Sequence, residues 1–325
     1  MTNDLITMNT VADRMEIIKT IFQDAKDKAL AQDDVEELIR HLSTTNPEFI
    51  SVAYEGASMG LALKDFTNMK PPFIPPKGEK PENGFSYTPL RGEGGLWNSF
   101  MNVSENHAAQ MYIGLGWAVA QEKKTAPFYS PEGGNSGDAS SQIPPSGGGG
   151  ALMQFRLWDG CGYYDGLFRQ RQTIKNQIRH DYIPAAAYQM YDQGLGRSLW
   201  YLCKGDETKI PEMIRQFSSS RHPDLWRGVG IACAYVGGCG ETIFKTLSSS
   251  AEKHFLQLGI GAAMAAKARI LANSITKDID HACKAWCNLS AEEATRIAIK
   301  TEGTSGGSFP LWLSQMETEM MKSNS

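Results

Sequence analysis

Residues 104–122, SENHAAQMYIGLGWAVAQE, are the stretch from which the fold class of this chain is best inferred. His107, Met111, Gly114 and Ala118 recur at the spacing of one helix face. Ser104 stands where an N-cap residue is expected. The stretch therefore predicts a helix, and its glycine and alanine residues leave one face small.

Comparable patterns occupy most of the chain, and strand-like alternation is scarce. We therefore expect a mainly α fold in which residues 1–325 form a single helical domain around an apolar cavity. The segments predicted to be helical on this basis are residues 12–30, 33–42, 49–66, 191–202, 257–273 and 290–300.

The sequence also contains a weak internal repeat. Residues 107–120 (HAAQMYIGLGWAVA) resemble residues 222–234 (HPDLWRGVGIACA), and residues 55–63 (EGASMGLAL) resemble residues 259–268 (GIGAAMAAKA). One interpretation is an internal duplication of a helical unit. The other is that helices rich in glycine and alanine resemble one another by chance.

Two segments are predicted to be irregular. Residues 70–98 contain several prolines and glycines, which is typical of a long loop that crosses the surface. Residues 130–150, SPEGGNSGDASSQIPPSGGGG, are of low complexity and contain nothing that packs into a core. We interpret the second segment as a flexible Gly/Ser/Pro insertion and not as a domain boundary.

The composition excludes several classes of protein. Hydrophobic residues make up 41% of the chain and charged residues 21%, with a net charge of −4, and no basic stripe points to nucleic acid. No run of about 18 apolar residues predicts a transmembrane segment. The first ten residues lack the basic and apolar parts of a secretory signal, so we expect a cytoplasmic protein. The oligomeric state stays open, and a homo-oligomer is one option.

The cysteines do not predict a metal site. Six cysteines are present without a CxxC pair. On a helix, Cys283 and Cys287 share a face, but His281 points about 200° away from Cys283. This arrangement is poor for tetrahedral zinc, so we expect buried thiols and no metal.

Five motifs occur in an order that is known from one protein family. They are residues 54–61 (YEGASMGL), 107–118 (HAAQMYIGLGWA), 158–160 (WDG), 193–197 (QGLGR) and 225–230 (LWRGVG). Together they resemble the bacterial family called domain of unknown function 1702, from about Met15 to about Lys300. Members of that family occur in enediyne polyketide and other natural-product gene clusters. The resemblance thus implies a role in secondary-metabolite biosynthesis.

Two features depart from the family pattern. Where the family tends to show a histidine after the WDG motif, this chain has Tyr164. The insertion at residues 130–150 is also unusual for the family. Both departures are compatible with a divergent substrate or reaction.

Glu55 and His107 are the first candidate catalytic residues. Each lies in a predicted helix that is otherwise small or apolar, so its side chain needs a partner or a shifted pKa. A glutamate and a histidine in contact are suited to general acid/base chemistry near neutral pH. The alternative is a structural ion pair or a solvated helix edge.

A second candidate group combines aspartates with aromatic residues. Asp159 and Asp192 are further candidates for acid/base or anchoring roles, and aromatic walls suit an apolar polyene or a cationic intermediate. The alternative is an aromatic core whose aspartates cap helices. We expect Arg197 to bind a polar end of the substrate. The residues expected to shape the cavity are Trp117, Trp158 and Tyr164.

These observations lead to one functional hypothesis and two alternatives. The hypothesis is a cofactor-independent enzyme that cyclises or isomerises a hydrophobic polyene, polyketide or isoprenoid. No P-loop, nucleophile elbow or HExxH motif occurs, so we expect no nucleotide or flavin cofactor. The first alternative is a non-catalytic carrier or accessory protein. The second is a magnesium-dependent terpene cyclase that uses Asp33 and Asp34, although helix capping explains these two residues better.

Overall fold

The computed structural model describes residues 10–68, 95–122, 152 and 155–323. Within these ranges every regular element is an α-helix or a short 3-10 or π-helical turn, and no strand occurs. The mainly α fold predicted from the sequence is therefore confirmed. The predicted loop at residues 70–98 lies outside the described residues except for its end, where a short helix begins at Leu96, and the insertion at 130–150 lies wholly outside them.

The α-helices follow one another along the chain with short connections between most of them. In chain order they are α1 (Val11–Ala31), α2 (Val35–Leu42), α3 (Ile50–Asn68), α4 (Leu96–Asn102), α5 (Ala108–Glu122), α6 (Arg156–Phe168), α7 (Tyr188–Leu202), α8 (Ile210–Arg215), α9 (His222–Val236), α10 (Glu241–Ala251), α11 (Phe255–Leu271), α12 (Lys277–Cys287), α13 (Ala291–Thr304) and α14 (Phe309–Ser323).

Local signals explain several helix ends. Ser290 and Glu293 form the reciprocal capping box that begins α13, as the sequence predicts. The N-cap of α2 is Asp34, whose side chain accepts a hydrogen bond from the backbone of Glu37 at 2.9 Å. Ser104 makes no side-chain cap, because a 3-10 turn at Glu105–His107 comes before α5.

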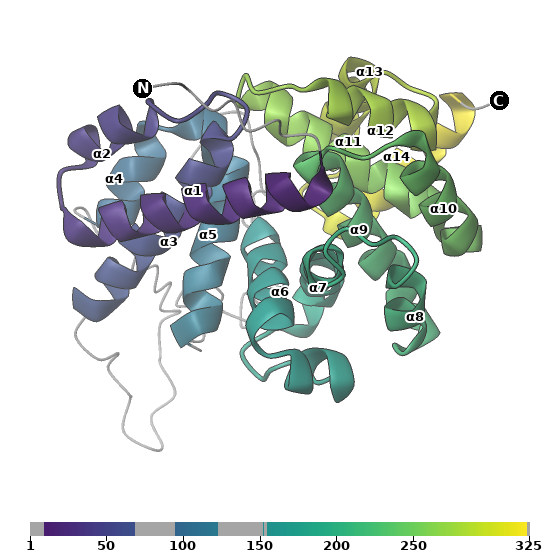
Figure 1. Cartoon of the computed structure of the whole chain (residues 1–325), viewed down its shortest axis with the longest axis horizontal. Coiled ribbons are helices and arrows are strands. Elements are labelled where there is room, and N and C mark those ends of the chain that lie inside the picture. The colour runs from purple at the N-terminus through teal and green to yellow at the C-terminus, as the bar shows by residue number, and fades with distance from the viewer. Residues whose placement is uncertain (1–9, 69–94, 123–151, 153–154, 324–325) are drawn as a thin grey trace.

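Six helices form a row in which each packs on the next. The order of this row is α3, α5, α6, α7, α9 and α11. Helix α1 crosses in front of the row, packing along α3 and reaching α9 with its N-terminal end (Figure 1). Helices α12, α13 and α14 pack around α11. Helix α1 thus lies across one side of the row.

Pairs of glycines set the spacing within the row. Residues two apart on a helix point in nearly opposite directions, so a Gly-x-Gly pair leaves room for a neighbour on both sides. A Cβ atom on Gly194 of α7 would lie 1.8 Å from the carbonyl oxygen of Asp159 in α6. A Cβ atom on Gly196 would lie 2.1 Å from the carbonyl oxygen of Leu225 in α9. The backbones of neighbouring helices are therefore in direct contact.

The same arrangement recurs along the row. Helices α5, α6 and α9 also carry a glycine pair, with the first glycine against the preceding helix and the second against the next helix. The first glycines of α6, α7 and α9 follow at equal intervals along the chain, which favours a repeated helical unit over chance resemblance. These pairs are Gly114 and Gly116, Gly160 and Gly162, and Gly228 and Gly230.

Candidate functional site

A cavity of about 800 Å³ lies between α1 and the row of helices, and α1, α3, α5, α6, α7 and α9 all contribute to its lining. Its volume is typical of sites for small organic ligands. Many lining residues come from the same positions relative to the glycine pairs. The third residue after the first glycine supplies Trp117, Tyr163 and Arg197, and the seventh supplies Gln121, Leu167, Tyr201 and Tyr235. Residues three and seven positions along a helix lie on nearly the same face.

Glu55 of α3 is the acidic group in the interior of this cavity. Its side chain is 5% exposed, and its carboxyl makes no hydrogen bond or ion pair with any described residue. Burial raises the pKa of Glu55 from 4.5 to about 7, with Asp159 adding to the rise and Arg197 opposing it. The carboxyl is therefore present in both protonation states near neutral pH, as acid/base catalysis requires.

Arg197 of α7 is the buried cation of the cavity, whose lining also includes Lys19, Lys26 and Lys204. Its Nη1 donates a hydrogen bond to Asp159 at 2.7 Å, and its guanidinium lies 4.6 Å from the ring centre of Tyr163. Its Nε has no hydrogen-bond partner among the described residues. Burial lowers the pKa of Arg197, but the charges of Asp159 and Glu55 outweigh this effect and raise it. Arg197 thus stays charged.

Asp159 lies behind Arg197. It is 2% exposed, and it accepts hydrogen bonds from Arg197 and from the amide of Gln193. Both acceptor oxygens are therefore occupied by neighbours in α7. Asp159 does not line the cavity, so this arrangement suits a residue that positions Arg197 better than one that reacts with a substrate.

Aromatic rings form much of the cavity wall. Trp117 lies at the centre of the group, with its ring 4.7 Å from Phe22 and 4.9 Å from Tyr163. The rings of Tyr164 and Phe168 follow at 5.7 and 5.9 Å. The wall thus combines one ring from α1 with rings from α5 and α6, and such faces bind both polyenes and cations.

Three phenols also reach the cavity, and none of them was among the predicted site residues. Burial raises the pKa of Tyr163 and Tyr235, and it raises the pKa of Tyr201 to about 12. These side chains are therefore neutral hydrogen-bond donors at neutral pH. The signal that identifies them is their offset from the glycine pairs, which is shared with Trp117 and Arg197.

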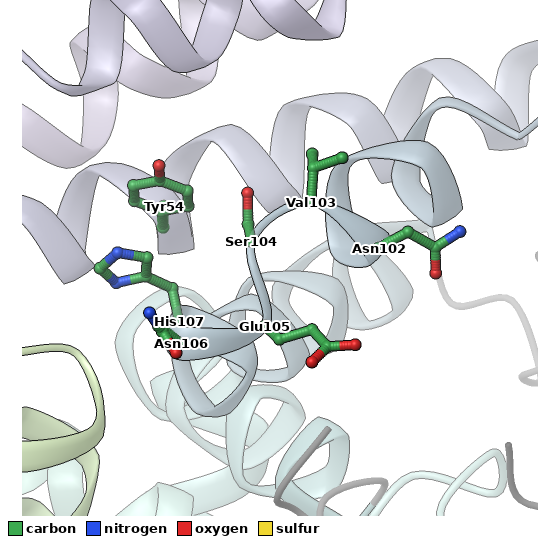
Figure 2. Close-up of a pocket in the computed structure, with 7 residues that line it drawn as sticks. All are labelled: Tyr54, Asn102, Val103, Ser104, Glu105, Asn106 and His107. Carbon is green, nitrogen blue, oxygen red and sulfur yellow. The ribbon is translucent and has the colours of Figure 1, made fainter. Parts of the chain in front are cut away.

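His107 lies in a second pocket of about 340 Å³, which residues 102–107 and Tyr54 line (Figure 2). Its Nδ1 is 3.1 Å from the hydroxyl of Ser51, and its ring stacks on Tyr54 with 3.8 Å between ring centres. Burial lowers the pKa of His107 to about 4, so the imidazole is neutral near pH 7. The structure thus places Glu55 and His107 in different pockets.

Asp192 and Trp158 also lie away from the main cavity. Asp192 is 1% exposed and accepts hydrogen bonds from Arg221 at 2.9 Å and from Arg179 at 3.2 Å. This pairing with two guanidinium groups is a structural arrangement. Trp158 of α6 is buried in the hydrophobic core of the protein and is not among the residues that line the cavity. The cavity thus contains Glu55, Trp117, Tyr164 and Arg197 of the predicted site residues.

Carboxylates, histidines and cysteines do not gather into a candidate metal site in the described part of the chain. Cys283 and Cys287 are buried free thiols. Asp33 forms an ion pair with Lys64, and Asp34 caps α2, so neither aspartate lines the cavity.

Replacing Asp34 with alanine is therefore expected to remove a helix cap and nothing else. The free energy of unfolding should fall by about 1 kcal/mol, because the backbone of Glu37 loses its partner. Urea denaturation of the variant measures this loss, with Asp33→Ala as the control because the Asp33 side chain is largely exposed. Loss of a magnesium-dependent product in Asp34→Ala would contradict the purely structural role.

The fold and the site define a class of protein: an all-helical domain with a large aromatic cavity that contains one buried, unpaired carboxyl group. The family model described as "Protein of unknown function (DUF1702)" matches residues 90–312, and the chain belongs to this family. No curated protein and no solved structure matches the chain. In the described ranges, no helix is both long enough and apolar enough to cross a membrane.

Proposed function

We propose that this protein is a cofactor-independent enzyme of natural-product biosynthesis that cyclises or isomerises a hydrophobic substrate in the cavity under α1. The observation that carries the proposal is the carboxyl of Glu55, which is buried, has no partner among the described residues and faces an aromatic cavity. A protein does not gain stability by burying an unpaired carboxyl group, so such groups are found preferentially where they do chemistry.

The surroundings of Glu55 fit proton transfer to and from an apolar molecule. Burial places its pKa at about 7, close to the pH at which a general acid or base works best. The rings of Trp117, Tyr163 and Phe22 provide apolar walls that keep water away from the reacting part of the substrate. Arg197 provides one fixed positive charge, which Asp159 holds in place.

A carrier protein is the competing function, because the same cavity would hold a reactive intermediate without changing it. The two functions make different demands on Glu55. A carrier needs the shape of the wall, which Trp117 and Tyr164 determine. An enzyme needs the proton of Glu55 as well, so an isosteric replacement of this residue separates the two functions.

Replacing Glu55 with glutamine is expected to abolish turnover and leave ligand binding intact. We expect a loss of about 10²- to 10⁴-fold in rate, because glutamine keeps the shape but exchanges no proton. The measurement is a mass-spectrometric assay with linear polyenes, polyketides and isoprenyl diphosphates, with and without EDTA, together with native mass spectrometry of bound ligand.

Glu16→Gln is the matched control, because Glu16 lies on α1 at the rim of the same cavity with an exposed side chain. It should retain both turnover and binding. Equal turnover in Glu55→Gln and the parent would contradict the proposal. Ligand that co-purifies unchanged with both proteins would favour the carrier function, and a product lost with EDTA would favour the magnesium-dependent cyclase.

A further inference from the structure

The polar groups of the cavity are informative about the substrate as well as the enzyme. This inference rests on the proposed function and concerns the same site. We infer that the substrate carries a neutral carbonyl group, whose oxygen Arg197 and Tyr201 bind while Glu55 moves a proton at the neighbouring carbon.

The inventory of hydrogen-bonding groups is the first observation behind this inference. Arg197, Tyr163, Tyr201 and Tyr235 all line the cavity and all carry hydrogen-bond donors. Tyr163 and Tyr201 are hydrogen-bonded to each other, so one O–H of this pair stays free for a ligand, and Arg197 Nε has no partner among the described residues. Glu55 is the one carboxylate in the interior part of the described lining. A ligand that satisfies these donors must supply acceptor lone pairs. An alkene has none, whereas a carbonyl oxygen has two.

The charge balance is the second observation. Arg197 already forms a buried ion pair with Asp159 at 2.7 Å, so its positive charge is largely compensated. A carboxylate or phosphate deep in the cavity would add a negative charge beside Glu55 and Asp159. The other cations of the lining, Lys19, Lys26 and Lys204, are half-buried or exposed, so they do not balance a charge at that depth. A neutral oxygen gains the hydrogen bonds and avoids this cost. The cavity therefore favours a ketone, aldehyde or thioester over an acid.

The arrangement of the donors is the third observation. Arg197 and Tyr201 lie four residues apart on α7, so they share one face of that helix. Tyr163 contacts both of them, with 4.6 Å from its ring centre to the Arg197 guanidinium and 5.5 Å to the ring centre of Tyr201. Donors clustered in this way can hold the single oxygen on which negative charge develops.

The acidity of Glu55 agrees with this geometry. A carboxyl with a pKa of about 7 is a weak acid and a correspondingly stronger base. It is poorly suited to protonate an isolated double bond, which gives a high-energy cation. It is well suited to remove a proton from carbon when a neighbouring carbonyl, held by hydrogen bonds, takes up the charge.

The resulting step is balanced in atoms and electrons. The Glu55 carboxylate takes a proton from the carbon next to the carbonyl, so a C–H bond breaks and an O–H bond forms. The electron pair of the C–H bond moves into the carbonyl group and gives an enolate, whose oxygen Arg197 and Tyr201 bind. Glu55 then returns the proton to a more distant carbon, which moves a double bond into conjugation. Alternatively, the enolate carbon attacks a second carbonyl in the same chain and closes a ring. A C–C bond forms, the π bond of the second carbonyl breaks, and its oxygen takes the proton back from Glu55.

Deuterium exchange tests this inference without the natural substrate. The purified protein is incubated in D₂O with a long-chain linear β,γ-unsaturated ketone, and in parallel with a non-conjugated diene hydrocarbon of the same length. Proton NMR and mass spectrometry measure deuterium at each carbon. We expect deuterium beside the carbonyl and movement of the double bond in the ketone, and no deuterium in the hydrocarbon.

Variants assign the roles. Glu55→Gln should still bind the ketone, which native mass spectrometry detects. Its rate of deuterium exchange into the ketone should be at least about 100-fold lower than that of the parent. Tyr201→Phe should lower the exchange rate at saturating ketone by about 10²-fold and change its binding far less, because the hydrogen bond strengthens only when charge develops. Tyr188→Phe is the control, because this phenol lies on the same helix but outside the cavity lining. The Tyr188→Phe variant should catalyse deuterium exchange into the ketone at the parent rate.

The outcomes separate this inference from the proposed function. Deuterium in the hydrocarbon and none in the ketone would overturn the carbonyl inference and leave acid chemistry by Glu55 in place. Binding of both probes without exchange in either would overturn the carbonyl inference and the proposed enzymatic function, and would indicate a carrier. Exchange of the ketone at the parent rate in Glu55→Gln would remove Glu55 from the step.

Discussion

Gly194→Ala is expected to destabilise the protein by about 3 kcal/mol or more, because overpacking a helix contact forces backbone to move. The new Cβ atom would lie 1.8 Å from the carbonyl oxygen of Asp159 and 2.8 Å from the backbone nitrogen of Tyr163. Neither atom belongs to a flexible side chain, so α6 and α7 must separate. Urea denaturation at neutral pH measures the change in the free energy of unfolding.

Gly303→Ala is the matched control for this prediction. Gly303 also lies within a helix, α13, but a Cβ atom there would have no neighbour within 4 Å. This variant should gain up to about 1 kcal/mol from the higher helix propensity of alanine. Equal stability of Gly194→Ala and the parent would contradict backbone contact between α6 and α7.

The second large effect is a dependence of stability on pH that comes from Glu55. Its pKa is about 7 in the folded protein and 4.5 without burial. The protonated form therefore contributes stability fully below pH 4.5, and this stability is lost as the pH rises to about 7. The loss amounts to about 3 kcal/mol. Glu55→Gln lacks this loss, so its stability relative to the parent should rise by that amount between pH 4.5 and pH 8.

Urea denaturation of both proteins across this pH range measures the difference, in which the other titrating groups cancel. Glu16→Gln should show no comparable rise, because its side chain is exposed to solvent in the folded protein. A difference between Glu55→Gln and the parent that stays constant with pH would mean that the carboxyl is not desolvated.

Helix positions and the small helix faces were predictable because they depend on short-range patterns. The apolar spacing in α1, α3, α5, α7 and α11 reports which residues share a face. The Ser290 capping box is also a local interaction between residues three apart. The motif Gly114-Leu115-Gly116 was recognised as one of a resembling pair, but only the packed helices show that the two glycines face different neighbours.

Part of the site was predictable for a related reason. Glu55 stands out because a carboxyl in an apolar helix needs an explanation, and Trp117 and Arg197 lie in the motifs that resemble the family. The structure places all three on one cavity. Tyr201 and Tyr235 were missed because a tyrosine in a helix is common. Only their spacing from the glycine pairs distinguishes them from core residues.

The roles of the other charged residues were decided by tertiary structure. His107 resembles Glu55 in its sequence surroundings, yet its ring bonds to Ser51 and stacks on Tyr54 in another pocket. Asp192 and Asp159 both lie among aromatic residues, yet guanidinium groups from distant segments neutralise both of them. No pattern within one segment predicts such partners.

The sequence by itself therefore determined a set of helices with small faces and the identity of one unusual carboxyl group. Only the tertiary structure decided which carboxylates are paired, because a partner on another helix is brought close by packing and not by spacing along the chain. Asp159 gained Arg197 in this way, whereas Glu55 was left facing a cavity. Burial without a hydrogen-bonded partner is what shifts a carboxyl toward neutral pH, and this property arises only after the helices have packed.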